Sequence, residues 1–350
     1  MTTNVLRSPA APYMGRPANR VLVLATFPLV ALPLAAYLLL GYRRIGDAVF
    51  ANPIVQGYTV CLGITHFFLT FTVYLSSANL RHFLSSSRNV FAFFVAPLVP
   101  MAGVAGWYGF AMNEQFAFAN GALLVAIRGL DFHHLCRQAF GVLQLVKGPG
   151  MRTLPRWTRT AENLFFLALA IQMFLTFKTG YRFDPSYPLT WVMCAVSGSL
   201  FVAMLAGYAI ALRAGADRKQ TAQALAYIAV QTGSCLLAIY RTGLYVTSLA
   251  VHYVEYHVIM HPRVFRSPIA ERDGVLRVVR KAPIVLYAVL FALGALWWIF
   301  QQRAATAVGG TRVLVHVFDG IFVFHYIIEM SIWKFSDPYF RKSLGPLYMP

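Results

Sequence analysis

Long apolar runs separated by short polar or basic tracts dominate the sequence. Because about 20 consecutive apolar residues cross a bilayer as an α-helix, each run of that length predicts one membrane span. The runs lie at 21–42, 53–77, 90–112, 116–146, 162–178, 188–213, 283–301 and 312–334. The pattern therefore predicts an all-α, polytopic membrane helix bundle. We expect residues 1–20 and 335–350 to be short cytoplasmic tails around one transmembrane domain, 21–334.

The stretch 221–261 is long enough for either one very long helix or two helices that meet near Arg241 and Gly243. Lys and Arg concentrate in cytoplasmic loops, so their distribution discriminates between the two arrangements. With one helix, the two sides of the membrane carry nearly equal numbers of Lys and Arg. With two helices, most of these residues lie on one side. The second arrangement is favoured, and it predicts about ten spans with both termini in the cytoplasm.

The composition supports a membrane protein, because 58% of the residues are hydrophobic and only 12% are charged. The net charge of +18 comes from short tracts between spans, so it indicates topology and we expect no nucleic-acid partner. We expect membrane lipids as partners instead, in a multi-pass protein of a bacterial inner membrane. Two basic segments, 148–160 and 263–282, suit contact with anionic headgroups or serve only to fix the topology.

Many ionisable side chains fall inside the predicted spans, where each costs at least ~2.5–3.5 kcal/mol at a helix centre. The histidines and the acidic residues named below lie on even-numbered helices, which all run in the same direction. The histidines also lie at similar distances from the cytoplasmic ends of these helices. The histidines expected as metal ligands are His66, His133, His134, His252, His257 and His325. The acidic residues expected to assist catalysis are Glu329, Glu255 and Asp131. The charged residues of this set can instead form buried ion pairs that only specify packing.

Spacing along the helices ranks these candidates. Residues four apart share one helix face, and His257 precedes His261, His325 precedes Glu329, and His134 precedes Gln138 in this way. We therefore favour His66, His134, His257 and His325 as the ligands that touch the metal, and His133 can exchange with His134. Gln138 and Asp131 are expected to orient those ligands.

Imidazoles with a carboxylate, and no cysteine thiolate, are ligands for iron, copper or zinc. We expect iron rather than copper or zinc, because a site within lipid meets apolar substrates and dioxygen. The sequence thus predicts a metalloenzyme that oxidises a lipid or isoprenoid with dioxygen, with an apolar small molecule as substrate and an electron-donor protein as a further partner. Two alternatives stay open: a proton-coupled transporter with a His and carboxylate relay, and a haem-binding electron carrier.

Known histidine motifs do not extend this interpretation. Membrane fatty-acid desaturases use clusters of paired histidines, and only His257 with His261 matches one of them. The scatter of single histidines over several spans resembles the general style of bacterial membrane carotene oxygenases. That resemblance is architectural, because no specific motif is shared.

Overall fold

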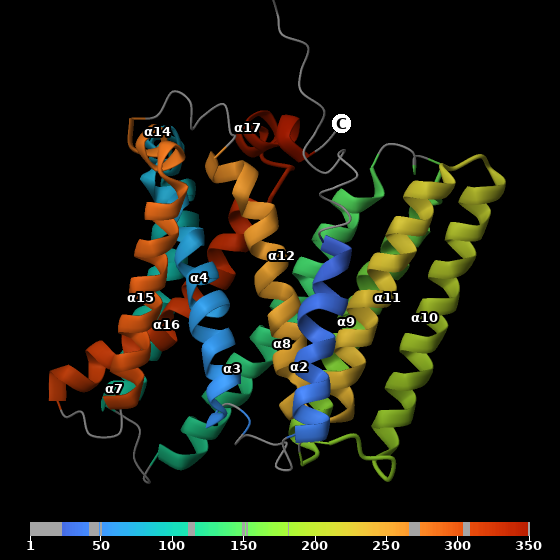
Figure 1. Cartoon of the computed structure of the whole chain (residues 1–350), viewed down its shortest axis with the longest axis horizontal. Helices are drawn as coiled ribbons and strands as arrows, with labels where there is room; N and C mark the ends of the chain where they lie inside the picture. Colours follow the sequence, from blue (N-terminus) through green and yellow to red (C-terminus); the bar gives the residue numbers. More distant parts are fainter. Residues whose placement is uncertain are drawn as a thin grey trace, which may run out of the picture.

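The structure, a computed structural model, describes residues 23–41, 49, 51–110, 116–148, 151, 153–180, 182–265, 274–303 and 309–348. The regular elements within these ranges are all helical, and extended backbone pairs only in one bridge between Arg182 and Arg241. The long helices stand side by side as a bundle (Figure 1). The predicted all-α class is confirmed.

The helices follow the predicted runs closely. The first half of the chain forms α2 (Leu32–Ala36) between the π-helical turns η2 (Phe27–Ala31) and η3 (Tyr37–Gly41), then α3 (Pro53–Tyr58), the π-helical η5 (Thr59–Ile64), α4 (Thr65–Thr70), the 3-10 turn η6 (Phe71–Leu75), α5 (Ser77–Phe83), α6 (Ser87–Val90), the π-helical η7 (Phe91–Val95), α7 (Ala96–Phe110) and α8 (Ala117–Lys147). The second half forms α9 (Arg156–Lys178), α10 (Pro188–Arg213), α11 (Arg218–Tyr240), the 3-10 turn η10 (Thr242–Leu244), α12 (Tyr245–Phe265), α14 (Gly274–Lys281), α15 (Pro283–Arg303), α16 (Gly309–Ile332) and α17 (Pro338–Tyr348).

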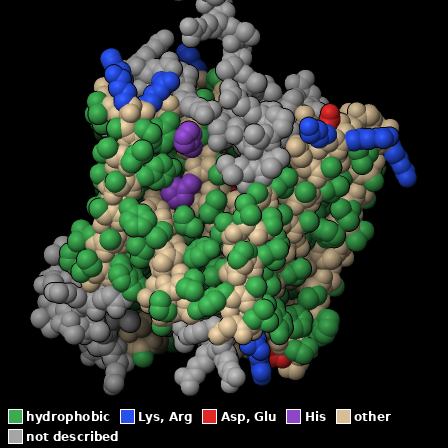
Figure 2. All heavy atoms as spheres, viewed as in Figure 1, with side chains coloured by type: hydrophobic (Ala, Val, Ile, Leu, Met, Phe, Trp, Pro, Cys, Tyr) green, Lys and Arg blue, Asp and Glu red, His purple; other side chains and the backbone are tan. Residues whose placement is uncertain are grey.

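Within the residues that the structure describes, seven helical segments are long and apolar enough to cross a membrane. They are Val23–Gly41, Pro53–Leu75, Ser87–Gly109, Arg156–Lys178, Pro188–Arg213, Arg218–Tyr240 and Pro283–Phe300. A broad hydrophobic band covers the visible face, and Lys and Arg side chains lie at its two ends (Figure 2). These features support a multi-pass membrane protein. Helices α8, α12 and α16, which we also expect to span, carry most of the ionisable side chains and are not among the seven; the count of ten spans and the orientation stay predictions.

The ambiguous stretch 221–261 forms two helices. Helix α11 ends at Tyr240, and Arg241 adopts extended backbone with φ −150° and ψ 129°. The 3-10 turn η10 follows, and α12 begins at Tyr245. Backbone hydrogen bonding from Phe183 N to the Tyr240 carbonyl, at 3.1 Å, holds the break against the segment before α10. The division that the charge distribution favoured is therefore present in the fold.

The end of the chain, expected as a tail, folds onto the bundle. Helix α17 lies across the same end of the molecule as α14 (Figure 1). Its Phe340, Leu344 and Tyr348 are buried, and the Tyr348 hydroxyl donates to the Ile259 carbonyl of α12 at 2.5 Å. Aromatic and leucine side chains thus give this segment an apolar face that packs on the bundle. The N-terminal tail, 1–20, lies outside the described residues.

Helix α16 packs against α7 at very close range, and glycine makes this possible. A Cβ atom added at Gly320 would overlap the backbone carbonyl of Met101 on α7. Only a residue without a side chain permits this approach. The contact sets the position of α16, which carries both His325 and Glu329.

We expect Gly320→Ala to lower the free energy of unfolding by about 1–3 kcal/mol, because the added methyl group forces two packed backbones apart. The measurement is thermal or denaturant-induced unfolding of the purified protein in detergent. Gly103→Ala on α7 is the matched control, because a Cβ at Gly103 meets nothing within 4 Å. Equal stability of the two variants would contradict the proposed role of the α7–α16 contact.

Candidate metal centre

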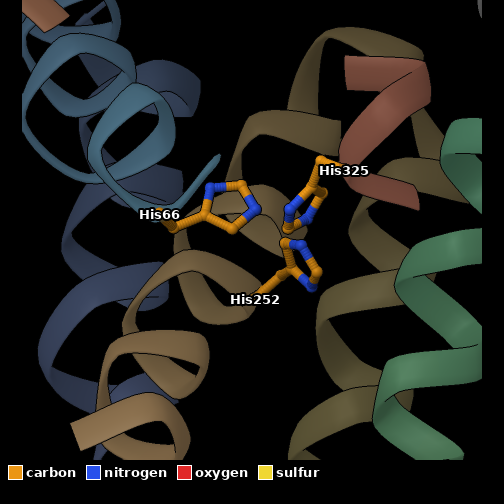
Figure 3. Close-up of side chains that lie close together, drawn as sticks. All are labelled: His66, His252 and His325. Atoms are coloured by element: carbon orange, nitrogen blue, oxygen red, sulfur yellow. The ribbon is translucent and has the colours of Figure 1, made fainter. Parts of the chain in front are cut away.

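Four helices that are distant in sequence bring four histidines together in the interior of the bundle. His66 comes from α4, His134 from α8, His252 from α12 and His325 from α16. All four are buried, and His66 and His325 are fully inaccessible to solvent. Figure 3 shows the rings of His66, His252 and His325 pointing toward one another from three different helices.

The four imidazole rings form a closed square. The centroid of the His66 ring lies 5.1 Å from that of His252 and 4.6 Å from that of His325. His134 closes the square, with its centroid 5.1 Å from each of the same two rings. With metal–nitrogen bonds of about 2.0–2.1 Å, adjacent imidazoles around one ion place their centroids about 4.5–5 Å apart. The ring spacing therefore matches that of neighbouring ligands around an ion, and the donor atoms form two groups of three that share His325.

The buried donor atoms of these residues lack hydrogen-bond partners among the described residues. They are Nε2 of His66, Nε2 of His134, Nδ1 of His252, Nε2 of His325 and Oε1 of Glu329. Leaving a buried polar atom unpaired costs about 1–3 kcal/mol, so native proteins rarely collect several in one place. Among the described residues, five such atoms lie on neighbouring side chains, and only Nε2 of His134 has a charged group within hydrogen-bond distance, the Glu329 carboxylate at 3.2 Å, so these side chains can hold a ligand.

Hydrogen bonds at the opposite ring nitrogen fix two of the imidazoles. Nδ1 of His66 lies 2.5 Å from the Gly63 carbonyl, which can only accept, so this nitrogen carries the proton. Nδ1 of His325 lies 2.7 Å from the Thr70 hydroxyl. This contact orients the His325 ring, whose tautomer depends on which of the two groups donates. For His66, Nε2 is then unprotonated, which is the state that binds a metal.

The backbone before His66 explains how its ring reaches the interior. The π-helical turn Thr59–Ile64 precedes α4 directly, and such turns in α-helices are concentrated at functional sites. Gly63 in this turn leaves room for the Tyr253 ring, which a Cβ at Gly63 would meet at 2.7 Å. The Tyr253 ring packs on the His66 ring, with centroids 4.6 Å apart. The Gly63 carbonyl and the Tyr253 ring thus hold the His66 side chain in position.

Glu329 adds a carboxylate next to the histidines, one helical turn after His325. Its Oε2 lies 3.2 Å from Nε2 of His134 and 3.8 Å from Nε2 of His325. Donor atoms of His134, His325 and Glu329 lie within 4.8 Å of one another, and so do those of His66, His252 and His325. These buried His and Glu side chains can hold a transition-metal ion, and their nitrogen and oxygen donors suit iron, copper and zinc alike.

One of the four histidines that we favoured as ligands does not lie in the cluster. His257 lies outside the cluster, where its Nε2 contacts the Thr65 hydroxyl at 3.2 Å and the Leu62 carbonyl at 3.3 Å. His252 takes its place. The two residues are five apart on α12, which turns them onto different helix faces: the His252 ring meets the His66 and His134 rings, whereas the His257 ring meets Thr65 of α4 away from the cluster. The predicted depth was similar for both, but depth does not specify the face.

Two further candidates also lie away from the cluster. His133 is half-buried and precedes His134, so its side chain leaves α8 about 100° around the helix axis from that of its neighbour. Glu255 is buried against α11, where it accepts hydrogen bonds from the Tyr227 hydroxyl at 3.1 Å and the Gln231 amide at 2.5 Å. The Glu255 carboxylate therefore links two helices and does not reach the four histidines.

Asp131 and Gln138 flank His134 on α8, as expected of residues that orient a ligand. Asp131 accepts a hydrogen bond from the Tyr326 hydroxyl at 2.5 Å, and the Tyr326 ring stacks on the His134 ring with centroids 4.2 Å apart. The Gln138 amide donates to the His252 carbonyl at 3.3 Å. Asp131 thus positions His134 through Tyr326 and does not itself contact the cluster.

Sequence reasoning did not single out the aromatic and hydroxyl groups that support the histidines. Thr70 lies four residues after His66, but its hydroxyl contacts His325 and the Tyr256 hydroxyl, the latter at 2.6 Å. Tyr326 and Tyr253 had no distinguishing pattern in a sequence that is 15% aromatic. Their roles depend on contacts between helices, which spacing along one helix does not reveal.

Comparisons with known proteins give no relative: no family model, curated protein or solved structure matches this chain.

We expect the detergent-purified protein to bind about one transition-metal ion per chain, because the two groups of donors share His325, whose unpaired Nε2 can ligate one ion. His66→Ala, His134→Ala, His252→Ala and His325→Ala should each lose most of the bound metal, measured by elemental analysis. His257→Ala and His133→Ala are the controls and should retain it. Retention in all four cluster variants, with the fold intact by circular dichroism, would place any metal elsewhere.

We expect Thr70→Val to weaken metal affinity by about 10–100-fold, because the substitution removes the hydroxyl that fixes the His325 ring without changing its size. The measurement is competition with a chelator of known affinity. Thr72→Val is the matched control, since its buried hydroxyl donates only to the Leu69 carbonyl of its own helix, at 2.6 Å. An unchanged affinity in Thr70→Val would show that this hydrogen bond does not tune the site.

Proposed function

We propose that the protein is a membrane-embedded, histidine-ligated metalloenzyme that uses dioxygen to oxidise a lipid or isoprenoid substrate. The observation that carries this proposal is the convergence of four unpartnered imidazole nitrogens and one carboxylate oxygen in the interior of an apolar bundle. A site that only stabilised the fold would satisfy these atoms with hydrogen bonds.

The donor set favours iron within this proposal. His134, His325 and Glu329 supply two imidazoles and one carboxylate, a combination that non-haem iron oxygenases use with open coordination positions. His66 and His252 form a second group of donors with the same His325, so further imidazole nitrogens are available to an ion held at this site. Such an ion would supply the redox chemistry, and no thiolate is close enough to favour copper(I) or a structural zinc site.

The surroundings of the cluster suit an apolar substrate. Phe67 packs on the ring of His325, with centroids 4.8 Å apart, and Phe322 packs on Phe67 at 4.5 Å. Trp297 and Tyr253 belong to the same buried cluster of side chains. These aromatic side chains keep water away from the cluster, and the absence of water strengthens the electrostatic interactions of its charged groups. If Glu329 bound the ion through Oε2, its unpaired Oε1 would be free to accept or return a proton beside the ligands.

The electron balance depends on the class of oxidation. Cleavage of a carbon–carbon double bond places one oxygen atom on each of the two carbonyl products and consumes no external electrons. Hydroxylation or desaturation reduces dioxygen with two electrons from the substrate and two from a donor, which is why we include an electron-donor protein among the proposed partners.

The geometry favours this proposal over a haem carrier. Axial histidines of one haem face each other across the iron, on opposite sides of the macrocycle. Here neighbouring rings meet edge to face, with interplanar angles of 82–85° for His66 with His252, His66 with His325 and His134 with His252. A proton-coupled carrier is the second candidate, because Asp131, Glu255 and Glu329 are buried carboxyl side chains.

The test combines iron-loaded protein in nanodiscs with a panel of polyunsaturated acyl lipids and isoprenoids under isotopically labelled dioxygen. We expect metal-dependent dioxygen consumption and oxidised product by mass spectrometry. Glu329→Gln should lower the rate by about 100-fold or more if its carboxylate transfers a proton, and His325→Ala should abolish turnover. His257→Ala is the control with activity retained. Proton-coupled flux into vesicles by metal-free protein would instead support the carrier.

A further inference from the structure

A second polar site lies at the end of the bundle where α8 ends and α9 begins. An open pocket of 540 Å³ lies between the two helices, and its lining includes Lys147, Arg156 and Arg159. This cavity is separate from the histidine cluster, because none of the four histidines lines it. The three cationic side chains converge on it from both helices.

One of these cations is neutralised inside the protein, and the other two are not. Glu162 is fully buried and binds the Lys147 ammonium at 2.6 Å. The Tyr208 hydroxyl donates to the same carboxylate at 2.7 Å. Arg156 and Arg159 are exposed and have no acidic partner among the described residues. The cavity thus carries a surplus of two guanidinium charges, which suits an anion that presents oxygen atoms to both groups.

The backbone adds to this positive potential. Helix α9 begins at Arg156, and Pro155, which also lines the cavity, offers no side-chain cap to the first turn. The N–H groups of that turn and the helix dipole favour a negative charge at this end. A phosphate group is the common biological anion that matches both a helix N-terminus and a pair of arginines.

The position of the cavity identifies the source of the phosphate. Trp157, next to Arg156, is 46% exposed, and exposed tryptophan is enriched at the headgroup level of membranes. Helix α9 has 23 residues and therefore extends about 34 Å from this level, enough to cross the hydrocarbon core. Leu164, Leu167 and Ile171 are exposed on the same side of α9 as Arg156. A lipid bound with its phosphate at the arginines would lay an acyl chain over these three side chains.

We propose that the cavity between α8 and α9 binds the headgroup of an anionic phospholipid, with Arg156 and Arg159 holding the phosphate and the exposed apolar face of α9 holding an acyl chain. The site is independent of the metal centre, and a metal-free protein would bind the lipid equally well. Lys147 and Glu162 form the neutral floor of the site.

The test is native mass spectrometry of the protein released from detergent with added phosphatidylglycerol or phosphatidylcholine. We expect retention of phosphatidylglycerol over phosphatidylcholine, and at least about fivefold less retained phosphatidylglycerol in the double variant Arg156→Gln/Arg159→Gln. The control is Arg213→Gln/Arg218→Gln, which removes the same charge from exposed positions at the same end of the bundle, where α10 ends and α11 begins.

Three results would overturn the proposal. The first is equal retention of phosphatidylglycerol in the double variant and the wild type, with the fold of both confirmed by circular dichroism. The second is an equal loss of retained phosphatidylglycerol in the control variant, which would show that the lower net charge alone causes the loss. The third is displacement of the lipid by millimolar inorganic phosphate, which would assign the cavity to a soluble anion.

Discussion

The burial of lone pairs that have no hydrogen-bond partner is the constraint on which this structure depends. Each unpaired polar atom inside a protein costs about 1–3 kcal/mol, and five of them together rival the net stability of a typical domain, about 5–15 kcal/mol. The opposite ring nitrogens of His66 and His325 are paired, with the Gly63 carbonyl and the Thr70 hydroxyl. A metal ion held by the unpaired atoms would therefore link metal binding to folding stability.

Contacts between neighbouring helices orient those atoms toward the interior of the cluster. The Thr70 hydroxyl of α4 holds the His325 ring of α16, and the Gln138 amide of α8 holds the backbone of α12 at His252. Tyr326 joins α16 to α8 through its hydrogen bond to Asp131. Each helix that carries a ligand is therefore tied to another by a polar contact. Such contacts are more directional than the apolar packing around them, and they fix the rotation of each helix about its axis.

The sequence was sufficient for the helices and for much of the site. Apolar runs predicted most helix boundaries within a few residues, and the charge distribution predicted the break at Arg241, because both signals depend on local composition. His66, His134 and His325 were predicted from burial cost and spacing, and Glu329 from its position four residues after His325. His257 was favoured over His252 because it has an i+4 partner, but which face of α12 meets the other helices depends on packing between segments far apart in the chain. The folding of α17 onto α12 has the same origin.

The wide spacing of the four histidines along the chain has a consequence for biosynthesis. The first lies on the second helical segment and the last, with Glu329, on α16. Chains emerge from the ribosome N-terminus first, so His66 and His134 are synthesised well before His252 and His325. A metal ion that needs side chains from all four helices would therefore bind only after α16 has been made, and a chain that ended before residue 325 would carry an incomplete set of imidazoles.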